Sequence, residues 1–313
     1  MTVHVDERRT TSKRMPLPRN TARRRRRARL QPVLLFMVPS ALILGGFVFW
    51  PIVQSLYYSF FDWTIGADAQ NWVGLGNYAE LLSDDHFWNS LGVTLTFTAA
   101  SVIIVMLLAL AAAFALVKDS WFNRLVRSVF FFPTIVSLVS IGLVWKFLLD
   151  PSIGLVGGLF QAVGLPPVAW LQSTELALPT VIFVNIWKNV GYSMIILIAG
   201  LKGVPAERYE AGRLDGATDR QLTRYVSLPG IRPTLLFATL ILTIQSFQVF
   251  DLVYVMTGGG PIFATDSIVN QLFREGFVNF RTGYASAISW VLFLLIIVIS
   301  ALQLRFFRYN DVD

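Results

Sequence analysis

Six long apolar stretches constrain this chain more than any other feature, because a membrane-spanning helix needs roughly twenty mostly apolar residues. Pro39 and Pro51 interrupt the first stretch, which predicts a kink or an early exit of that helix. Of the 313 residues, 55% are hydrophobic and only 14% are charged, a composition that excludes an ordinary soluble domain. The sequence therefore predicts an all-α membrane protein with six transmembrane helices, at about 33–60, 93–117, 128–149, 177–200, 234–256 and 285–307.

Basic residues are distributed unevenly between the connecting segments. Five consecutive arginines, Arg23–Arg27, directly precede the first span, and no small-residue cleavage site follows promptly. Such a tract could bind nucleic acid, but beside a span it favours a retained anchor with a cytoplasmic amino terminus. Segments 61–92 and 150–176 contain no Lys or Arg, so we expect them outside. The expected inner loops carry Lys118, Arg124, Arg127, Lys202, Arg208, Arg213, Arg220, Arg224 and Arg232.

These charges predict the domain organisation, with both termini in the cytoplasm. The predicted parts are a basic cytoplasmic tail at 1–32, a first span at 33–60, an external loop at 61–92, a core of five spans at 93–307 that includes a cytoplasmic loop at 201–232, and a cytoplasmic tail at 308–313.

The loop at 201–232 is far longer than a connection between two spans requires. Pro205 suits the first turn of a helix. Gly216 suits a turn, because glycine adopts a left-handed backbone conformation at little energetic cost. Thr218 or Asp219 can cap a second helix, which Pro229 is expected to end. The pattern predicts a helix, a glycine turn and a second helix. Such a hairpin could lie on anionic lipid headgroups or dock to a cytoplasmic partner.

The loop contains "EAGRLDGA" followed by "LPGIRP", which resembles the cytoplasmic Glu-Ala-Ala signature of ATP-binding-cassette importer permeases. Gly212 departs from that signature, which usually has a second alanine there. The segments "IWKNVGYSMIILIAGLKGVPAERYEAGRLDGA" and "FQVFDLVYVMTGGGP" look like the carbohydrate-uptake branch, and the resemblance covers about Gly92 to Phe307. The resemblance implies that nine residues couple this chain to an ATP-binding subunit: Glu207, Glu210, Ala211, Gly212, Asp215, Gly216, Ala217, Leu228 and Pro229.

This resemblance implies a type I importer permease fold in a bacterial cell (inner, or plasma) membrane, surrounded by the lipid bilayer. It implies that the hairpin is a coupling helix that inserts into a cleft of the ATP-binding subunit. The implied partners are a second homologous permease subunit, two ATP-binding subunits that hold ATP and Mg, an extracytoplasmic solute-binding protein, and a sugar or oligosaccharide substrate. Transport would proceed by alternating access.

No enzyme is predicted within this chain. The glycine-rich "TGGGP" at 257–261 lacks the Lys-Ser/Thr ending of a phosphate-binding loop. We find no nucleophile with a base, no metal-ligand spacing and no paired carboxylates, and the chain contains no cysteine. We therefore expect no catalytic residue, no metal, no cofactor and no bound nucleic acid on this chain, and ATP hydrolysis on separate subunits.

Polar residues inside two predicted spans are the remaining chemistry. We expect them to line a path for a hydroxyl-rich solute, whose rings would pack on Trp187, Tyr192 and Phe247. The alternative is interhelical hydrogen bonding, with Lys188 closing on Asp251 or on a carbonyl. The candidate path residues are Asn185, Lys188, Asn189, Tyr192, Gln245, Gln248 and Asp251.

Other functions stay open at this stage. Glycerol 3-phosphate or another phosphorylated polyol is the main alternative substrate. The acidic outer loops disfavour an anion, but Lys188 could bind one. If the protein were an ion-coupled secondary carrier, its sequence should contain internal repeats with broken helices, and we see no such repeat. A membrane scaffold would use its intramembrane polar residues only for structure. The sequence names neither the sugar nor the partner subunits.

Overall fold

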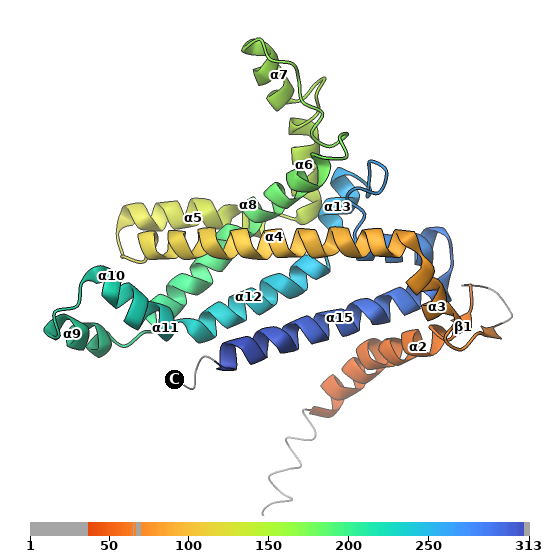
Figure 1. Ribbon diagram of the computed structural model, residues 1–313, viewed down its shortest axis with the longest axis horizontal. Helices are drawn as coiled ribbons and strands as arrows, with labels where there is room; N and C mark the ends of the chain where they lie inside the picture. The colour runs from red at the N-terminus through yellow and green to blue at the C-terminus, as the bar shows by residue number, and fades with distance from the viewer. Residues whose placement is uncertain (1–36, 65, 67–69, 310–313) are drawn as a thin grey trace, which may run out of the picture. The chain divides into compact units, whose positions relative to one another are not determined.

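A computed structural model describes residues 37–64, 66 and 70–309 of the chain. The predicted basic tail at 1–32, its arginine tract and residues 310–313 lie outside the described residues. The chain divides into two compact units, Met1–Ser55 and Leu56–Asp313, and each is described by itself. The described chain is almost entirely helical, as Figure 1 shows, so the predicted all-α class is confirmed.

The first predicted span is helical from Met37 to Tyr58 and passes through both prolines. Directly before Pro51 lies a π-helical turn, η1 (Gly45–Phe49), and α2 (Trp50–Tyr58) follows it. The Trp50 amide donates to the Gly45 carbonyl across this wider turn. Proline has no backbone N–H, and its ring clashes with the preceding turn of an α-helix. The wider π turn before Pro51 accommodates both effects. The early exit that the prolines allowed does not occur.

The segment predicted as an external loop is largely structured. Strand β1 (Phe61–Asp62) pairs antiparallel with β2 (Asn71–Trp72), and α3 (Gly76–Ser83) follows. The next helix, α4 (Asp85–Leu116), begins well before the predicted start of the second span at 93. Asp84 explains this early start, because its side chain accepts a hydrogen bond from the His86 amide at 2.9 Å and caps the helix.

The third predicted span, 128–149, is not one helix. It forms parts of α5 (Trp121–Ile135) and α6 (Leu138–Leu148), whose axes are bent by 98°. Between them, Val136 has an extended backbone and Ser137 has φ −57° and ψ 137°, so neither is helical. Pro133 lies inside α5 and is followed by three β-branched residues, Thr134 to Val136, so both the missing amide and the weak helix propensity favour a break at this place.

The fourth predicted span agrees with α8 (Ala177–Lys202), whereas the fifth, 234–256, is also broken. Helix α12 (Arg232–Phe247) ends at an irregular segment, and α13 (Asp251–Met256) follows it. Phe250 in this segment has φ −134° and ψ −64°, outside helical geometry. The sixth span agrees with α15 (Thr282–Tyr309).

In the described part of the chain, four helices are long and apolar enough to cross a membrane, or up to six if each of two bent pairs counts as one span. The second bent pair is Asp219–Gly230 with Arg232–Phe247, bent by 62°. The remaining helices are α7 (Leu155–Ala162), α9 (Ala206–Leu214), α10 (Asp219–Leu222), η2 (Thr223–Ser227), α11 (Leu228–Gly230), α14 (Ile268–Phe273) and η3 (Arg274–Val278).

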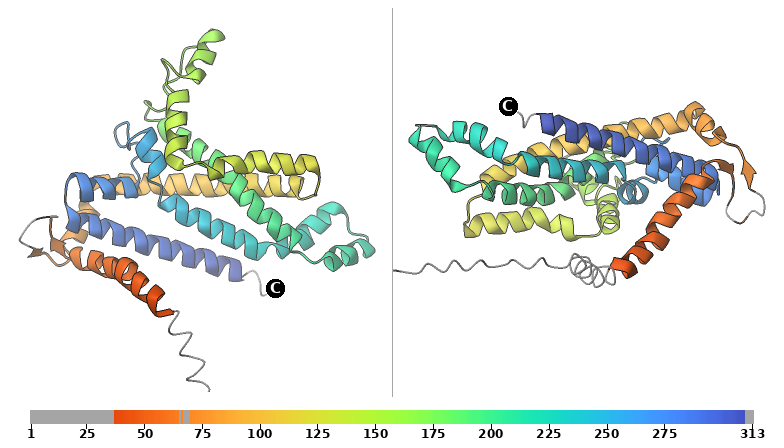
Figure 2. Two further views of the ribbon diagram at one scale, coloured as in Figure 1. Left: turned by 180° about the vertical axis from the view of Figure 1, so that it is seen from behind. Right: turned by 90° about the horizontal axis from the view of Figure 1, so that it is seen from below.

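Within the unit Leu56–Asp313, the long helices pack against one another around several apolar clusters. Helix α4 packs along α8, and α12 contacts α4, α8 and α15. Figures 1 and 2 show the consequence: α9 and α10 lie at one end of the α8–α12 pair, while α6 and α7 project away from α4. The chain therefore places the α9–α10 hairpin directly between the two helices α8 and α12.

Candidate functional site

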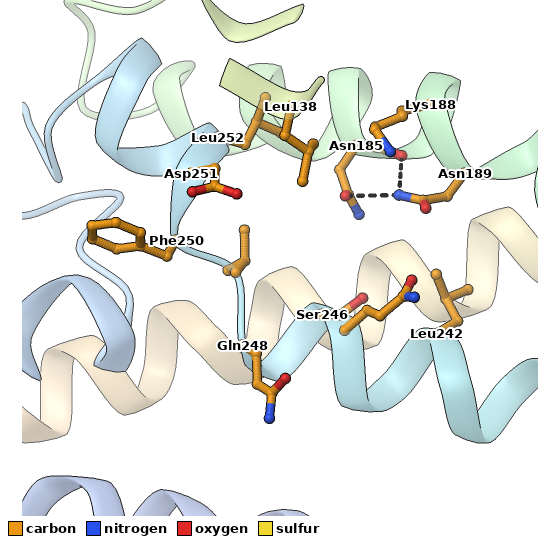
Figure 3. Close-up of a pocket in the computed structure, with 12 residues that line it drawn as sticks. Leu138, Asn185, Lys188, Asn189, Leu242, Ser246, Gln248, Phe250, Asp251 and Leu252 are labelled. Atoms are coloured by element: carbon orange, nitrogen blue, oxygen red, sulfur yellow. Dashed lines mark hydrogen bonds between the residues drawn. The ribbon is translucent and has the colours of Figure 1, made fainter. Parts of the chain in front are cut away.

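A pocket of about 310 Å³ lies between α8, α12 and the irregular segment that leads into α13 (Figure 3). Its lining combines amide and charged side chains with a few apolar ones. The lining residues are Leu138, Asn185, Lys188, Asn189, Leu242, Gln245, Ser246, Gln248, Val249, Phe250, Asp251 and Leu252.

The α8 wall of the pocket carries a short chain of hydrogen bonds. Asn189 Nδ2 donates to both the backbone and the side-chain oxygen of Asn185, each at 2.9 Å. The buried Asn185 in turn donates to Ser101 Oγ on α4 at 3.0 Å, an interhelical bond of the kind that the structural alternative predicted. The half-buried Lys188 differs, because its ammonium group makes no hydrogen bond or ion pair with the residues that the structure describes.

The opposite wall presents the side chains of Gln245, Gln248 and Asp251. All three are exposed and line the pocket, and within residues 37–64, 66 and 70–309 their side chains accept and donate no hydrogen bond. Phe250 adds an aromatic wall, held by Tyr254 and Phe273 with ring centroids at 5.2 and 5.1 Å. The pocket thus contains polar groups whose hydrogen-bonding capacity is unused.

The structure gathers six of the seven predicted path residues around this one pocket. Tyr192, half-buried on α8, is not among the lining residues. The predicted ion pair between Lys188 and Asp251 does not form among the described residues, and Lys188 donates to no carbonyl there. Whether these residues contact a solute stays a prediction.

None of the three aromatic residues expected to pack on the rings of the solute lines this pocket. Trp187 points to another face of α8, where its ring packs edge-on against Trp145 with centroids 5.6 Å apart. Phe247 is 2% exposed and belongs to an apolar cluster of the core. Sequence reasoning missed Phe250 because it treated 234–256 as one continuous helix; the helix break turns this residue into the pocket.

The loop between α8 and α12 forms the predicted helix, glycine turn and helix. Gly216 has φ +80°, the left-handed conformation that the turn was expected to use. Thr218 caps α10 in a capping box with Gln221, whose backbone N–H donates to Thr218 Oγ1 at 3.4 Å. Pro229 does not end the second helix as predicted. The helical path runs through η2 and α11 to Gly230, because the π turn of η2 precedes the proline.

Close packing holds the two arms of the hairpin together. A Cβ atom at Gly212 would lie 2.6 Å from Leu222 Cδ2, so this departure from the family signature lets the arms approach closely. The hydroxyl groups of Tyr209 and Ser227 are hydrogen-bonded at 3.0 Å. The hairpin is therefore a defined element rather than an irregular loop.

The hairpin exposes two large apolar side chains among its charged ones. Leu214 is 89% exposed and Tyr225 is 67% exposed. Such protruding apolar side chains among charged ones favour a docking surface. The assigned coupling residues Glu207, Glu210, Ala211, Asp215 and Gly216 are exposed, whereas Gly212, Ala217, Leu228 and Pro229 are half-buried.

A polar link that the sequence analysis missed lies at the base of the hairpin. Lys202, the last residue of α8, contacts Asp119 in the loop between α4 and α5. Arg127 of α5 donates to Asp119 at 3.3 Å and to the carbonyl groups of Leu116 and Lys118. The hydrogen bond from Lys202, and then that from Arg127, lowers the pKa of the Asp119 carboxyl below its ordinary value.

Comparison with known proteins gives one consistent result. Residues 105–311 match the family described as "Binding-protein-dependent transport system inner membrane component". The chain is 31% identical to the sn-glycerol-3-phosphate transport system permease protein UgpA of Agrobacterium fabrum, over 87% of this chain and 93% of that protein. It is 32% identical to the diacetylchitobiose uptake system permease protein NgcF of Streptomyces coelicolor, over 93% of this chain and 88% of that protein.

The fold also matches a solved structure. In the crystal structure of a bacterial alginate ABC transporter in complex with alginate pentasaccharide-bound periplasmic protein, one chain superimposes with a TM-score of 0.77 at 21% identity. The match covers 88% of this chain and 93% of that one. The two chains share a fold.

Proposed function

This chain belongs to the family of binding-protein-dependent transport system inner membrane components, and on that premise we propose that it is the permease subunit of an ATP-driven importer of a sugar or oligosaccharide. The observation that carries this proposal is the polar pocket between α8, α12 and α13, where the side chains of Lys188, Gln245, Gln248 and Asp251 have no partner in the described chain.

Unpartnered polar groups at membrane depth are costly unless they face water or a solute. Gln245 and Gln248 can each donate and accept hydrogen bonds, Asp251 accepts and Lys188 donates. A sugar carries many hydroxyl groups that do both, so it can use all of these side chains. Phe250 offers the apolar face on which a sugar ring packs.

The exposed pocket wall on α12 and α13 favours a second permease subunit. Gln245, Gln248 and Asp251 face outward from this chain rather than into its core. A second permease that covers this face would close the transport path. Two ATP-binding subunits and an extracytoplasmic solute-binding protein would complete the importer. A fold neighbour was crystallised with a periplasmic protein, which supports the last of these partners.

The hairpin supplies the mechanical route from ATP to the pocket. It connects α8, which carries Lys188, to α12, which carries Gln245. We propose that an ATP-binding subunit, which holds ATP and Mg, grips the exposed face around Glu207 and Glu210. Closure of those subunits would move the hairpin and tilt both pocket walls together, which gives alternating access from the two sides of the membrane.

An importer of sn-glycerol 3-phosphate or a similar phosphorylated polyol is the second candidate. Two observations favour it: the Lys188 ammonium lacks a partner in the described chain, and a relative is named for sn-glycerol-3-phosphate transport. The outward segments with few basic residues do not favour an anionic solute.

One experiment separates these functions. The tagged chain is purified from its native membrane, the proteins that travel with it are identified, and neutral sugars and phosphorylated polyols are screened for stimulation of ATP hydrolysis. Stimulation by a neutral sugar supports the proposal, and stimulation only by a phosphorylated polyol supports the second candidate. Absence of any ATP-binding subunit would contradict both and favour an ion-coupled carrier or a scaffold.

A further inference from the structure

We propose that Lys188 and Asp251 together make the pocket selective for uncharged polyhydroxy solutes and select against phosphorylated ones. This inference rests on the proposed importer function and goes one step further, because it names the charge of the solute. It concerns two residues that enter the pocket from different elements, α8 and the start of α13.

The lining of the pocket carries one positive and one negative side chain. Among the twelve lining residues, only Lys188 and Asp251 are charged at neutral pH. Neither forms an ion pair in the part of the chain that the structure describes, and Figure 3 shows them on separate elements of the wall. The pocket is therefore neutral as a whole, yet offers two separate charged groups.

A neutral sugar gains from both charges at once. A hydroxyl group of the sugar donates to the Asp251 carboxylate, and another accepts from the Lys188 ammonium, and charge-assisted bonds of this kind are stronger than neutral ones. The free amides of Gln245 and Gln248 extend the same pattern along the wall. No net charge enters the pocket, so the transported solute creates no uncompensated charge at membrane depth.

A phosphorylated polyol meets a different balance. Its phosphate is attracted by Lys188 but repelled by Asp251 in the same pocket, and the two effects oppose each other. A site built for phosphate would instead surround it with donors and basic groups. Removing the Asp251 charge should therefore convert the pocket into one that accepts an anion.

The absence of cysteine from the chain provides a direct measurement. Gln245→Cys places a single thiol in the pocket wall, and the purified complex is treated with cationic 2-aminoethyl or anionic 2-sulfonatoethyl methanethiosulfonate. Asp251→Asn should shift the ratio of the two labelling rates toward the anionic reagent by about threefold to tenfold, and Lys188→Met should shift it the opposite way. Tyr225→Cys on the hairpin is the control, and its ratio should respond to neither substitution.

Protection of the introduced thiol then tests the solute. A mixture of neutral disaccharides should slow the labelling, sn-glycerol 3-phosphate should not, and Asp251→Asn should make sn-glycerol 3-phosphate protective. The inference is overturned if sn-glycerol 3-phosphate protects the Gln245→Cys pocket with Lys188 and Asp251 intact as well as the sugars do, if neither solute protects it, or if neither charge substitution changes the rate ratio. The rate ratio needs no ATP hydrolysis, so loss of the importer function in the purification experiment is distinguishable from failure of this inference.

Discussion

Lys202 Nζ donates to both carboxylate oxygens of Asp119, at 2.8 and 2.6 Å, and so joins the end of α8 to the loop between α4 and α5. The hairpin begins directly after Lys202, while Arg127 ties the same carboxylate to α5. We therefore expect a movement of the hairpin to reach the helices on both sides of this link.

We expect Asp119→Asn to lower the stimulation of ATP hydrolysis by solute while leaving the amount of assembled complex unchanged. The link is exposed, and exposed ion pairs contribute little to stability, so its effect should be on coupling rather than on folding. Glu175→Gln, an exposed acid in the expected outer segment, is the control. Normal stimulation in Asp119→Asn would show that the link transmits nothing.

The pH dependence of this link follows from the sign of its shift. The pKa of the Asp119 carboxyl is lowered in the folded chain, chiefly by the Lys202 hydrogen bond. The contribution of this carboxylate to stability is therefore fully present above the unfolded pKa of about 4. It is lost as the pH falls through the lower pKa of the folded chain. The stimulation of ATP hydrolysis by solute, measured from pH 6 to pH 8, should therefore show no change caused by the titration of Asp119. A pH-dependent change in that range that disappears in Asp119→Asn would contradict the lowered pKa.

Another prediction concerns the loop that follows α13. Asp266 is 0% exposed and accepts hydrogen bonds from Arg274 at 2.8 Å and from Asn270 at 2.5 Å. Asp266→Asn removes the charge that Arg274 pairs with and should destabilise the fold by about 1.5 to 3 kcal/mol. The measurement is the thermal unfolding midpoint of the purified complex, with the exposed Asp62→Asn as the control. Equal midpoints for the two variants would contradict the prediction.

A topological prediction rests on the loop charges. A reporter fused near Asp119 or Gly216 should be cytoplasmic, and one near Gly74 or Pro167 should be external, because Lys and Arg concentrate in the first pair of segments. The opposite pattern at either pair would disprove the six-span arrangement, which the bends in α5–α6 and α11–α12 leave open.

Hydropathy predicted where the apolar helices lie but not where they break. An average over twenty residues passes smoothly across Val136–Ser137 and across 248–250, although the backbone is non-helical at both places. The local signals were the β-branched run after Pro133 and, for the second break, none that we recognise. Phe250 was missed for that reason.

The hairpin was predicted more closely because its signals are local. A glycine after an aspartate and a threonine cap each act within a few residues, and the structure has both in place, at Gly216 and Thr218. The link between Asp119 and Lys202 could not be foreseen, because it joins residues 83 positions apart through tertiary packing alone.

If the hairpin couples ATP hydrolysis to the solute path, two substitutions in it should uncouple them by different routes. Glu210→Ala removes an exposed carboxylate that we expect to meet a cationic group, a contact that stabilises docking by about 1.5 to 3 kcal/mol. Gly216→Val forces a β-branched residue into φ +80°, at about 1 to 3 kcal/mol of strain, and misdirects the second arm. Gly164→Val is the matched control, since Gly164 has φ +77°, has open space around it and lies in the expected outer segment.

The decisive measurement is solute-stimulated ATP hydrolysis by the reconstituted complex, together with retention of the ATP-binding subunit on purification. We expect Glu210→Ala and Gly216→Val to lose stimulation or retention, while Gly164→Val keeps both. If both hairpin variants retain that subunit and respond to solute as the unsubstituted complex does, the hairpin does not couple the two activities, and it is a surface segment that rests on the membrane.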